Sequence, residues 1–282
     1  MSEAPAGATG SLLAGITVVN TGINVPIAVT GARLAELGAT VTKVEPPGGD
    51  PVREYAPAWY AALTAGQQVL ELDLKQRGAL DTHLAAADLL LTSSRPAALQ
   101  RLGLGWEPLH TRFPRLSHVA LVGYPSPDAE VPGHDLTYSA RHGLLMPPDL
   151  PRTLVADLGG AERVVSTACA LVLARDRDGE GRFAEVALSD AALLFAQPWL
   201  HGLTTRDGLL GGGYPCYGLY ESADGWIALA ALEGRFSEGL LAALGEESAD
   251  AATLQRWFRQ RTSADWEAWA HERDLPISAV QE

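Results

Sequence analysis

A chain of 282 residues is long enough to bury a sizeable core, and we expect two unequal domains. Its net charge of -13 argues against a nucleic-acid surface, because such binding depends on Lys and Arg side chains that neutralise phosphates. No stretch approaches the roughly 18 apolar residues of a membrane span, and Met1 to Gly15 predicts a loose leader without a secretory signal. These features predict a cytoplasmic protein that binds neither nucleic acid nor membrane.

Strands and helices alternate through the first two hundred residues. Residues 16–19 and 40–44 predict strands on either side of a helix that has Pro26 in its first turn and stops at Gly38. Such a unit favours right-handed parallel packing. The alternation continues with helices near 79–86, Ala97, Glu107 and 161–175, and with strands at 89–91, 116–122 and 183–188. The pattern predicts an α/β domain over residues 1–200, in which helices cover both faces of a parallel sheet.

The pattern changes near His201. Residues 201–213 end in three glycines and predict a glycine-rich linker. Two strands joined by a turn at 223–225 predict a β-hairpin, which begins a small α+β domain over 214–282. Its predicted helices cover 236–244, 254–258 and a segment capped by Thr262 or Ser263. The two cysteines, Cys169 and Cys216, predict structural thiols rather than a disulfide or a metal site.

Three separated motifs each supply a proton-transfer group: His134 in Gly-His-Asp, Asp157 before a helix, and Glu233 after the hairpin. An imidazole and a carboxylate on opposite sides of an acidic carbon suit a 1,1-proton transfer, because one removes a proton while the other returns one. Each residue also has a structural interpretation. Asp157 fits a helix N-cap, His134 a structural loop residue, and Glu233 an exposed residue before a helix.

The first strand–helix–strand unit also suggests a dinucleotide site, because Glu45 ends the second strand where such folds hold a ribose. However, residues 20–25 lack the G-x-G-x-x-G loop whose backbone approaches a pyrophosphate. We therefore do not expect NAD binding.

Many segments resemble, in family order, the class III CoA-transferases, a family that includes carnitine CoA-transferase, formyl-CoA transferase and α-methylacyl-CoA racemase. The matching segments are Leu34–Ala39, Lys43–Asp50 with Arg53, Leu72–Lys75, Ala87-Asp88, Arg95-Pro96, Arg101–Leu104, Gly133–Leu136, Asp157 and Tyr217–Gly225. The resemblance covers nearly the whole chain. It implies a Rossmann-like large domain that binds CoA, a smaller domain, a homodimer and an acyl-CoA substrate. No metal is expected, and no cofactor beyond the coenzyme A of the substrate.

The resemblance also implies roles for single residues. Asp157 matches the aspartate that transferases use as a nucleophile, forming an aspartyl-CoA thioester. The Gly-His-Asp-Leu motif around His134 is similar to the racemase branch, and Glu233 resembles a racemase acid that orients or charge-balances the histidine. The basic residues expected to contact CoA phosphates are Arg53, Lys75, Arg95 and Arg101.

Three functions follow from these residues. The first is a 2-methylacyl-CoA racemase or epimerase, in which His134 and Asp157 flank the α-carbon and a thioester enolate meets backbone donors at the Asp157 helix start. The second is CoA transfer through Asp157, which does not need His134. The third is a non-catalytic CoA-binding or scaffold protein.

Three departures from the family bear on these alternatives. Residues 64–68 lack the Arg and Lys that relatives carry there, residues 143–157 are shorter than in relatives, and the chain stops at Glu282, where relatives continue. The first departure predicts weaker CoA binding, and the second predicts a different wall between the two catalytic groups. The third predicts either a dimer less intertwined than those of relatives or an activity that has changed or disappeared.

Overall fold

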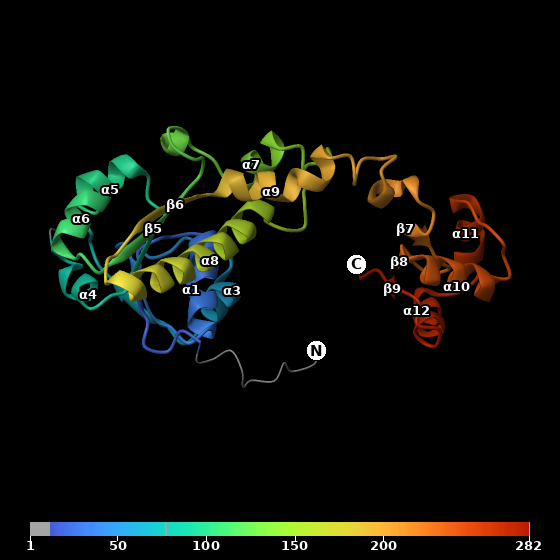
Figure 1. Cartoon of the computed structure of the whole chain (residues 1–282), viewed down its shortest axis with the longest axis horizontal. Coiled ribbons are helices and arrows are strands. Elements are labelled where there is room, and N and C mark those ends of the chain that lie inside the picture. The colour runs from blue at the N-terminus through green and yellow to red at the C-terminus, as the bar shows by residue number, and fades with distance from the viewer. Residues whose placement is uncertain (1–11, 77, 282) are drawn as a thin grey trace. The chain divides into compact units, whose positions relative to one another are not determined.

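The computed structural model describes residues 12–76 and 78–281, which divide into two units after Ala196 (Figure 1). Most of the predicted leader, residues 1–11, lies outside the described residues. Each unit contains its own sheet and its own buried apolar cluster. Within the described part of the chain, no helix is long and apolar enough to cross a bilayer.

The first unit is built on a six-stranded sheet with the strand order β3-β2-β1-β4-β5-β6. All of its neighbouring strands are parallel. The strands are β1 (Thr17–Asn20), β2 (Thr40–Glu45), β3 (Gln68–Glu71), β4 (Leu89–Thr92), β5 (Ser117–Val122) and β6 (Phe183–Ala187). This is the Rossmann order, in which the direction of strand addition reverses between β1 and β4. The predicted Rossmann-like parallel sheet is therefore confirmed.

Helices cover both faces of this sheet. The helices that begin in this unit are α1 (Val25–Glu36), α2 (Val52–Tyr55), α3 (Pro57–Leu63), α4 (Asp81–Ala85), α5 (Pro96–Leu102), α6 (Trp106–Arg112), α7 (Asp135–Arg141), α8 (Val155–Asp178) and α9 (Leu188–Leu200). On one face, α1 and α8 lie side by side over Val18, while on the other α4, α5 and α6 cover Val19. Successive residues of a strand point to opposite faces, which is why both are apolar here.

Helix α8 begins at Val155 rather than near the predicted Ala161. The predicted helix began just after Gly159 and Gly160, but both glycines lie inside the helix. A Cβ on Gly159 would lie 2.3 Å from Phe195, and one on Gly160 would lie 2.4 Å from Leu188. The glycines therefore allow α9 to approach α8 closely.

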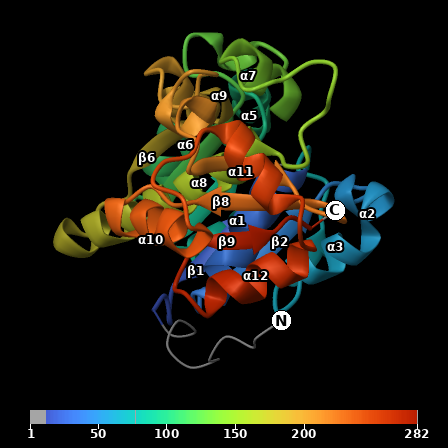
Figure 2. The ribbon, with the colours of Figure 1, turned by 90° about the vertical axis from the view of Figure 1, so that its right-hand side faces the viewer.

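The second unit contains the predicted hairpin, β7 (Tyr217–Glu221) and β8 (Trp226–Ala230). A third strand, β9 (Ile277–Ala279), pairs with β8 and was not predicted (Figure 2). Around the sheet lie α10 (Gly234–Leu244), α11 (Ala251–Phe258) and α12 (Ser263–His271), and a π-helical turn covers Leu209–Gly213 in the predicted linker. Thr262 is the N-cap of α12, since its side chain accepts a hydrogen bond from Asp265 N at 3.1 Å.

Candidate active site

A cavity of about 360 Å³ lies in the first unit, at the carboxyl ends of β1, β4 and β5. Its wall includes residues that follow these strands, among them Asn24, Arg95 and Gly123. His134, Tyr138 and Asp157 complete the polar part of the lining, while Ile23, Pro26, Val131 and Leu188 contribute apolar surface. In open α/β sheets, ligands bind where the strand order reverses, and this cavity lies at that point.

His134 reaches the cavity from the N-terminus of α7, where it is the N-cap residue. The Thr137 hydroxyl accepts a hydrogen bond from His134 N at 3.0 Å, which fixes the entry of the chain into the helix. The residue is exposed, so its imidazole is accessible to solvent. The sequence predicts His134 in a loop, whereas in the structure it stands at the start of a helix.

Asp157 lines the same cavity from the first turn of α8 and is half-buried. Burial raises the pKa of its carboxyl to about 7, with the neighbouring charge of Asp135 as the second cause. Near neutral pH, both the acid and the base form of this carboxyl are therefore present. A group in that state can either donate or accept a proton.

Asp135 connects the two helices that carry His134 and Asp157. Its side chain is buried, and its Oδ1 accepts hydrogen bonds from Ala156 N at 2.7 Å and from Asp157 N at 3.0 Å. A carboxylate at a helix N-terminus is favoured by unpaired N–H groups and by the helix dipole. The sequence interpretation assigned no role to Asp135, although it is the residue directly after His134.

These contacts correct two expectations about Asp157. It is not the N-cap of α8, because the helix starts at Val155 and the N-cap is Leu154. Nor are the N–H groups of Ala156 and Asp157 available to an enolate oxygen, since Asp135 accepts from both. The next N–H, that of Leu158, is bonded within the helix to Leu154 O.

The loop after β1 is held by a buried ion pair. Lys43 Nζ donates to Asp50 Oδ2 at 2.7 Å and to Gly22 O at 3.2 Å, and both charged side chains are fully buried. Asp50 Oδ1 in turn accepts from Asn24 N at 3.1 Å. The pair therefore fixes the backbone that brings Ile23 and Asn24 to the cavity wall.

The four predicted CoA-binding cations lie in different places. Arg95 lines the cavity with His134 and Asp157. Arg53 instead donates to Glu45 Oε2 at 3.0 Å and to the Tyr60 hydroxyl at 3.1 Å. Lys75 is exposed on the segment between β3 and α4. Glu45, considered above for a ribose, is buried and also accepts from Tyr60 Oη at 2.6 Å.

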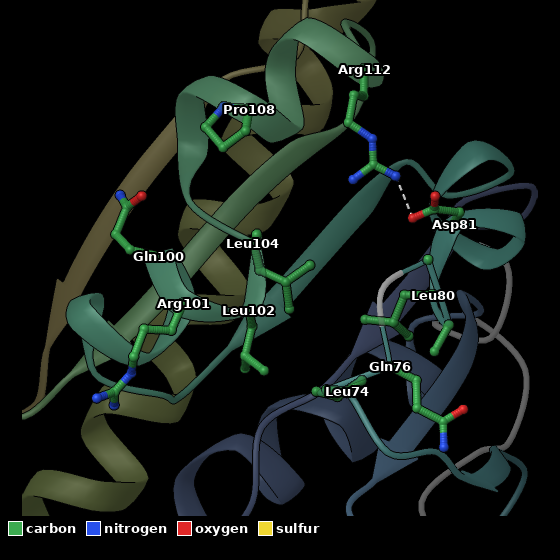
Figure 3. A pocket seen from close by; sticks show the side chains of 13 residues that line it. Leu74, Gln76, Leu80, Asp81, Gln100, Arg101, Leu102, Leu104, Pro108 and Arg112 are labelled. Atoms are coloured by element: carbon green, nitrogen blue, oxygen red, sulfur yellow. Dashed lines mark ion pairs between the residues drawn. The ribbon is translucent and has the colours of Figure 1, made fainter.

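Arg101 lines a second cavity, of about 500 Å³, between the segment that leads into α4 on one side and α5 and α6 on the other (Figure 3). Much of its lining is apolar, including Leu74, Leu80, Leu102 and Leu104. Arg112 and Asp81 reach toward each other across the opening from α6 and α4 and form an ion pair. The two cavities share no lining residue.

Glu233 belongs to the second unit, where it is the exposed N-cap residue of α10. The cavity with His134 and Asp157 is lined by residues of the first unit only. The role of Glu233 therefore stays a prediction. Among the described residues, no group of three or more His, Cys, Asp or Glu side chains is arranged to hold a metal ion.

Comparison with known proteins shows the family to which the sequence belongs. The sequence model described as CoA-transferase family III matches residues 13–282. The chain belongs to that family. The human protein named alpha-methylacyl-CoA racemase is 30% identical, over 90% of this chain and 74% of its own. A subunit of succinyl-CoA:(R)-benzylsuccinate CoA-transferase from Thauera aromatica is 34% identical, over 73% of this chain and 57% of its own.

Solved structures agree on the fold. A hypothetical protein from Mycobacterium tuberculosis superimposes with a TM-score of 0.80 at 24% identity, over 96% of this chain and 83% of that one. A CAIB/BAIF family protein from Brucella suis gives a TM-score of 0.79 at 21% identity, over 96% and 84%. The relatives in this family include both racemases and CoA-transferases, and this chain is an enzyme of that family.

Proposed function

We propose that the protein is a 2-methylacyl-CoA racemase or epimerase that acts by 1,1-proton transfer. The supporting observation is that one cavity is lined by both an imidazole, His134, and a carboxyl of raised pKa, Asp157. In this reaction, one of the two groups removes the α-proton of the thioester and the other delivers a proton to the opposite face. The thioester enolate lies between the two steps.

The pKa of Asp157 suits this chemistry in both directions. A racemase must act on both configurations of its substrate, so each group serves as a base in one direction and as an acid in the other. A carboxyl with a pKa of about 7 is available in both forms at neutral pH, whereas an ordinary aspartate is almost entirely ionised there. Glu233 is proposed to support the histidine, as the resemblance to racemases implies.

The CoA part of the substrate needs positive charge, because the whole chain carries a net charge of -13. Arg95 offers a guanidinium in the same cavity as His134 and Asp157. Arg53, Lys75 and Arg101 are the further proposed phosphate contacts. No cofactor beyond the CoA of the substrate is proposed, and the compartment is proposed to be the cytoplasm.

We also propose that the protein is a homodimer. In the first unit, helix α9 exposes the large apolar side chains of Leu194 and Phe195. Contiguous exposed apolar residues of this kind are typical of protein interfaces. Size-exclusion chromatography with light scattering should give twice the mass of the chain, and a clean monomer at micromolar concentration would contradict the proposal.

The test is incubation with a 2-methylacyl-CoA in deuterated water, with acetate present as an acceptor acid, followed by mass spectrometry. Deuterium at the α-carbon without CoA transfer is expected. His134→Ala should abolish the exchange, whereas His142→Ala, at the other end of α7 and outside the cavity lining, should leave it unchanged. Undiminished exchange in the His134 variant would remove this residue from the mechanism.

CoA transfer through Asp157 is the second candidate, and the identity of 34% to a transferase subunit favours it. In that reaction, the carboxylate attacks the thioester carbonyl, displaces the CoA thiolate and leaves a mixed anhydride on Asp157. It predicts CoA on the acceptor acid, a covalent adduct on Asp157 and indifference to His134. Neither deuterium exchange nor transfer would favour the non-catalytic CoA-binding protein.

A further inference from the structure

An enolate oxygen needs a hydrogen-bond donor, and the N–H groups of Ala156 and Asp157 at the start of α8 do not supply one. Asp135 already accepts from the N–H groups of Ala156 and Asp157. A donor that stabilises developing charge must be directed at the reacting oxygen and held in place before the reaction, preferably where water is excluded. A buried side-chain donor of fixed position in the cavity lining would meet this need.

Tyr138 meets these conditions. It lies on α7 one turn after His134, and its backbone N–H bonds to His134 O at 3.2 Å, so both side chains project from one face of the helix. Its side chain lines the cavity but is only 2% exposed to solvent. The other uncharged side-chain donors of the lining, on Asn24, Ser93 and Ser94, belong to half-buried residues, and Ser93 Oγ already donates to Ile23 O.

Two glycines and a second aromatic ring fix the position of the Tyr138 ring. A Cβ on Gly123 would lie 2.4 Å from the Tyr138 hydroxyl oxygen, and one on Gly133 would lie 2.5 Å from Cε1 of the ring. The ring therefore lies directly over the backbone at both positions. Tyr124 packs against it edge to face, with centroids 5.1 Å apart and an interplanar angle of 81°. The hydroxyl is thus held above Gly123, just beyond the carboxyl end of β5.

The hydroxyl is protonated and available. Burial raises the pKa of Tyr138 to about 12, with Tyr124 and Asp157 as further causes, while Arg95 acts in the opposite direction. The phenol therefore keeps its proton throughout the neutral range. Among the residues that the structure describes, none forms a hydrogen bond with this hydroxyl. The hydroxyl can therefore donate to a ligand in the cavity.

We propose that the Tyr138 hydroxyl donates a hydrogen bond to the thioester oxygen of the acyl-CoA in this cavity. The bond strengthens as negative charge develops on that oxygen, so Tyr138 contributes more to the transition state than to substrate binding. Tyr138 transfers no proton to the enolate, since its phenol is a far weaker acid than the Asp157 carboxyl. This inference rests on the proposed acyl-CoA chemistry.

The test compares Tyr138→Phe with Tyr124→Phe. Both variants lose one hydroxyl and keep the aromatic ring, but Tyr124 does not line the cavity. In Tyr138→Phe, kcat for α-proton exchange should fall by about 10²-fold, as found for removal of one oxyanion donor, with KM changed by less than about threefold. Tyr124→Phe should match the wild type.

Infrared difference spectra of a bound acyl-CoA with a 13C-labelled thioester carbonyl report the carbonyl stretching frequency. A Tyr138 that only supported the fold would not change this frequency. The carbonyl stretch should lie lower in the wild type and in Tyr124→Phe than in Tyr138→Phe. A frequency in the wild type that matches the thioester in a hydrocarbon solvent would overturn the proposal, even if the Tyr138 variant failed to fold. So would equal frequencies in the wild type and Tyr138→Phe.

The same experiment separates this proposal from the proposed function. A shifted carbonyl in a wild-type protein that catalyses no exchange supports the hydrogen bond and contradicts the racemase. Exchange in the wild type with no effect of Tyr138→Phe contradicts the hydrogen bond alone. Failure of the wild type to bind the acyl-CoA overturns both.

Discussion

Replacing Asp135 with Asn separates the charge of this carboxylate from its hydrogen bonds. Both N–H groups at the start of α8 donate to the same oxygen, Oδ1. An amide oxygen at that position can therefore accept from both, whereas Asp135→Ala would leave Ala156 and Asp157 without this partner. The Asn variant should keep the connection between α7 and α8 and remove only the negative charge.

The magnitude follows from the two hydrogen bonds. A bond to a charged group contributes about 1.5–3 kcal/mol and a neutral one about 0.5–1.5 kcal/mol, so two bonds that lose their charge reduce stability by about 2 kcal/mol. In Asp135→Ala, two buried donors lose their partner, and the loss should be about 2–6 kcal/mol. Urea denaturation of both variants checks this order.

The second effect of Asp135→Asn is on Asp157. Burial is the main reason why the pKa of Asp157 is about 7, and the charge of Asp135 is the second. The variant should therefore lower the pKa of Asp157 while leaving it above the ordinary value. The limb of the pH–rate profile that belongs to Asp157 should move to lower pH. The NMR signal of a 13C-labelled Asp157 carboxyl should likewise titrate at lower pH than in the wild type. Asp149→Asn, on the exposed loop between α7 and α8, is the control.

An unchanged limb in Asp135→Asn would refute the reasoning, because it would mean that Asp135 carries no charge that Asp157 senses. A limb that moved to higher pH would refute it more strongly. Equal loss of stability in the Asn and Ala variants would show that the two N–H groups gain nothing from the oxygen that Asn retains.

Two further predictions concern stability. Because folding raises the pKa of Asp157 from 3.8 to about 7, its contribution to stability is full below pH 3.8 and is lost as the pH rises through 7. The free energy of unfolding of Asp157→Asn, which never ionises, should exceed that of the wild type by about 1–3 kcal/mol at pH 8 after allowance for solvent screening, and by much less at pH 5. Urea titrations that give the same difference at both pH values would contradict this. Lys43→Met leaves Asp50 buried without its cation and should cost about 3–5 kcal/mol, and a loss below about 1 kcal/mol would show that the pair is not buried as described.

The sheet of the first unit was predictable because its signals are local. The central strands are short apolar runs, and the residues between them carry helix starts and stops such as Pro26 and Gly38. Helix α7 was missed because its buried positions, Asp135, Tyr138 and Ser139, carry polar groups and so form no apolar stripe. Strand β9 was missed because its three residues pair with β8 only through the tertiary fold.

The residues of the candidate site were found through motifs, but their connections were not. His134 and Asp157 were selected separately, and the structure brings both to the wall of one cavity. Asp135 accepts hydrogen bonds from the N–H groups of Ala156 and Asp157, which are 21 and 22 residues away in the sequence, and no local pattern signals such a pairing. The only available signal was the position of Asp135 beside His134 in a family-like motif.

The protonation of Asp157 is the property on which the two candidate reactions differ. A nucleophile in CoA transfer must be ionised, so burial that raises its pKa to about 7 reduces the reactive fraction at neutral pH. Proton transfer instead uses both forms of the carboxyl, and the same burial then places its pKa near the working pH. The carboxylate of Asp135 adds to this shift while it holds the start of α8 beside His134. A site selected for nucleophilic attack would gain from a cation at the position that Asp135 occupies, so the anion found there favours proton transfer.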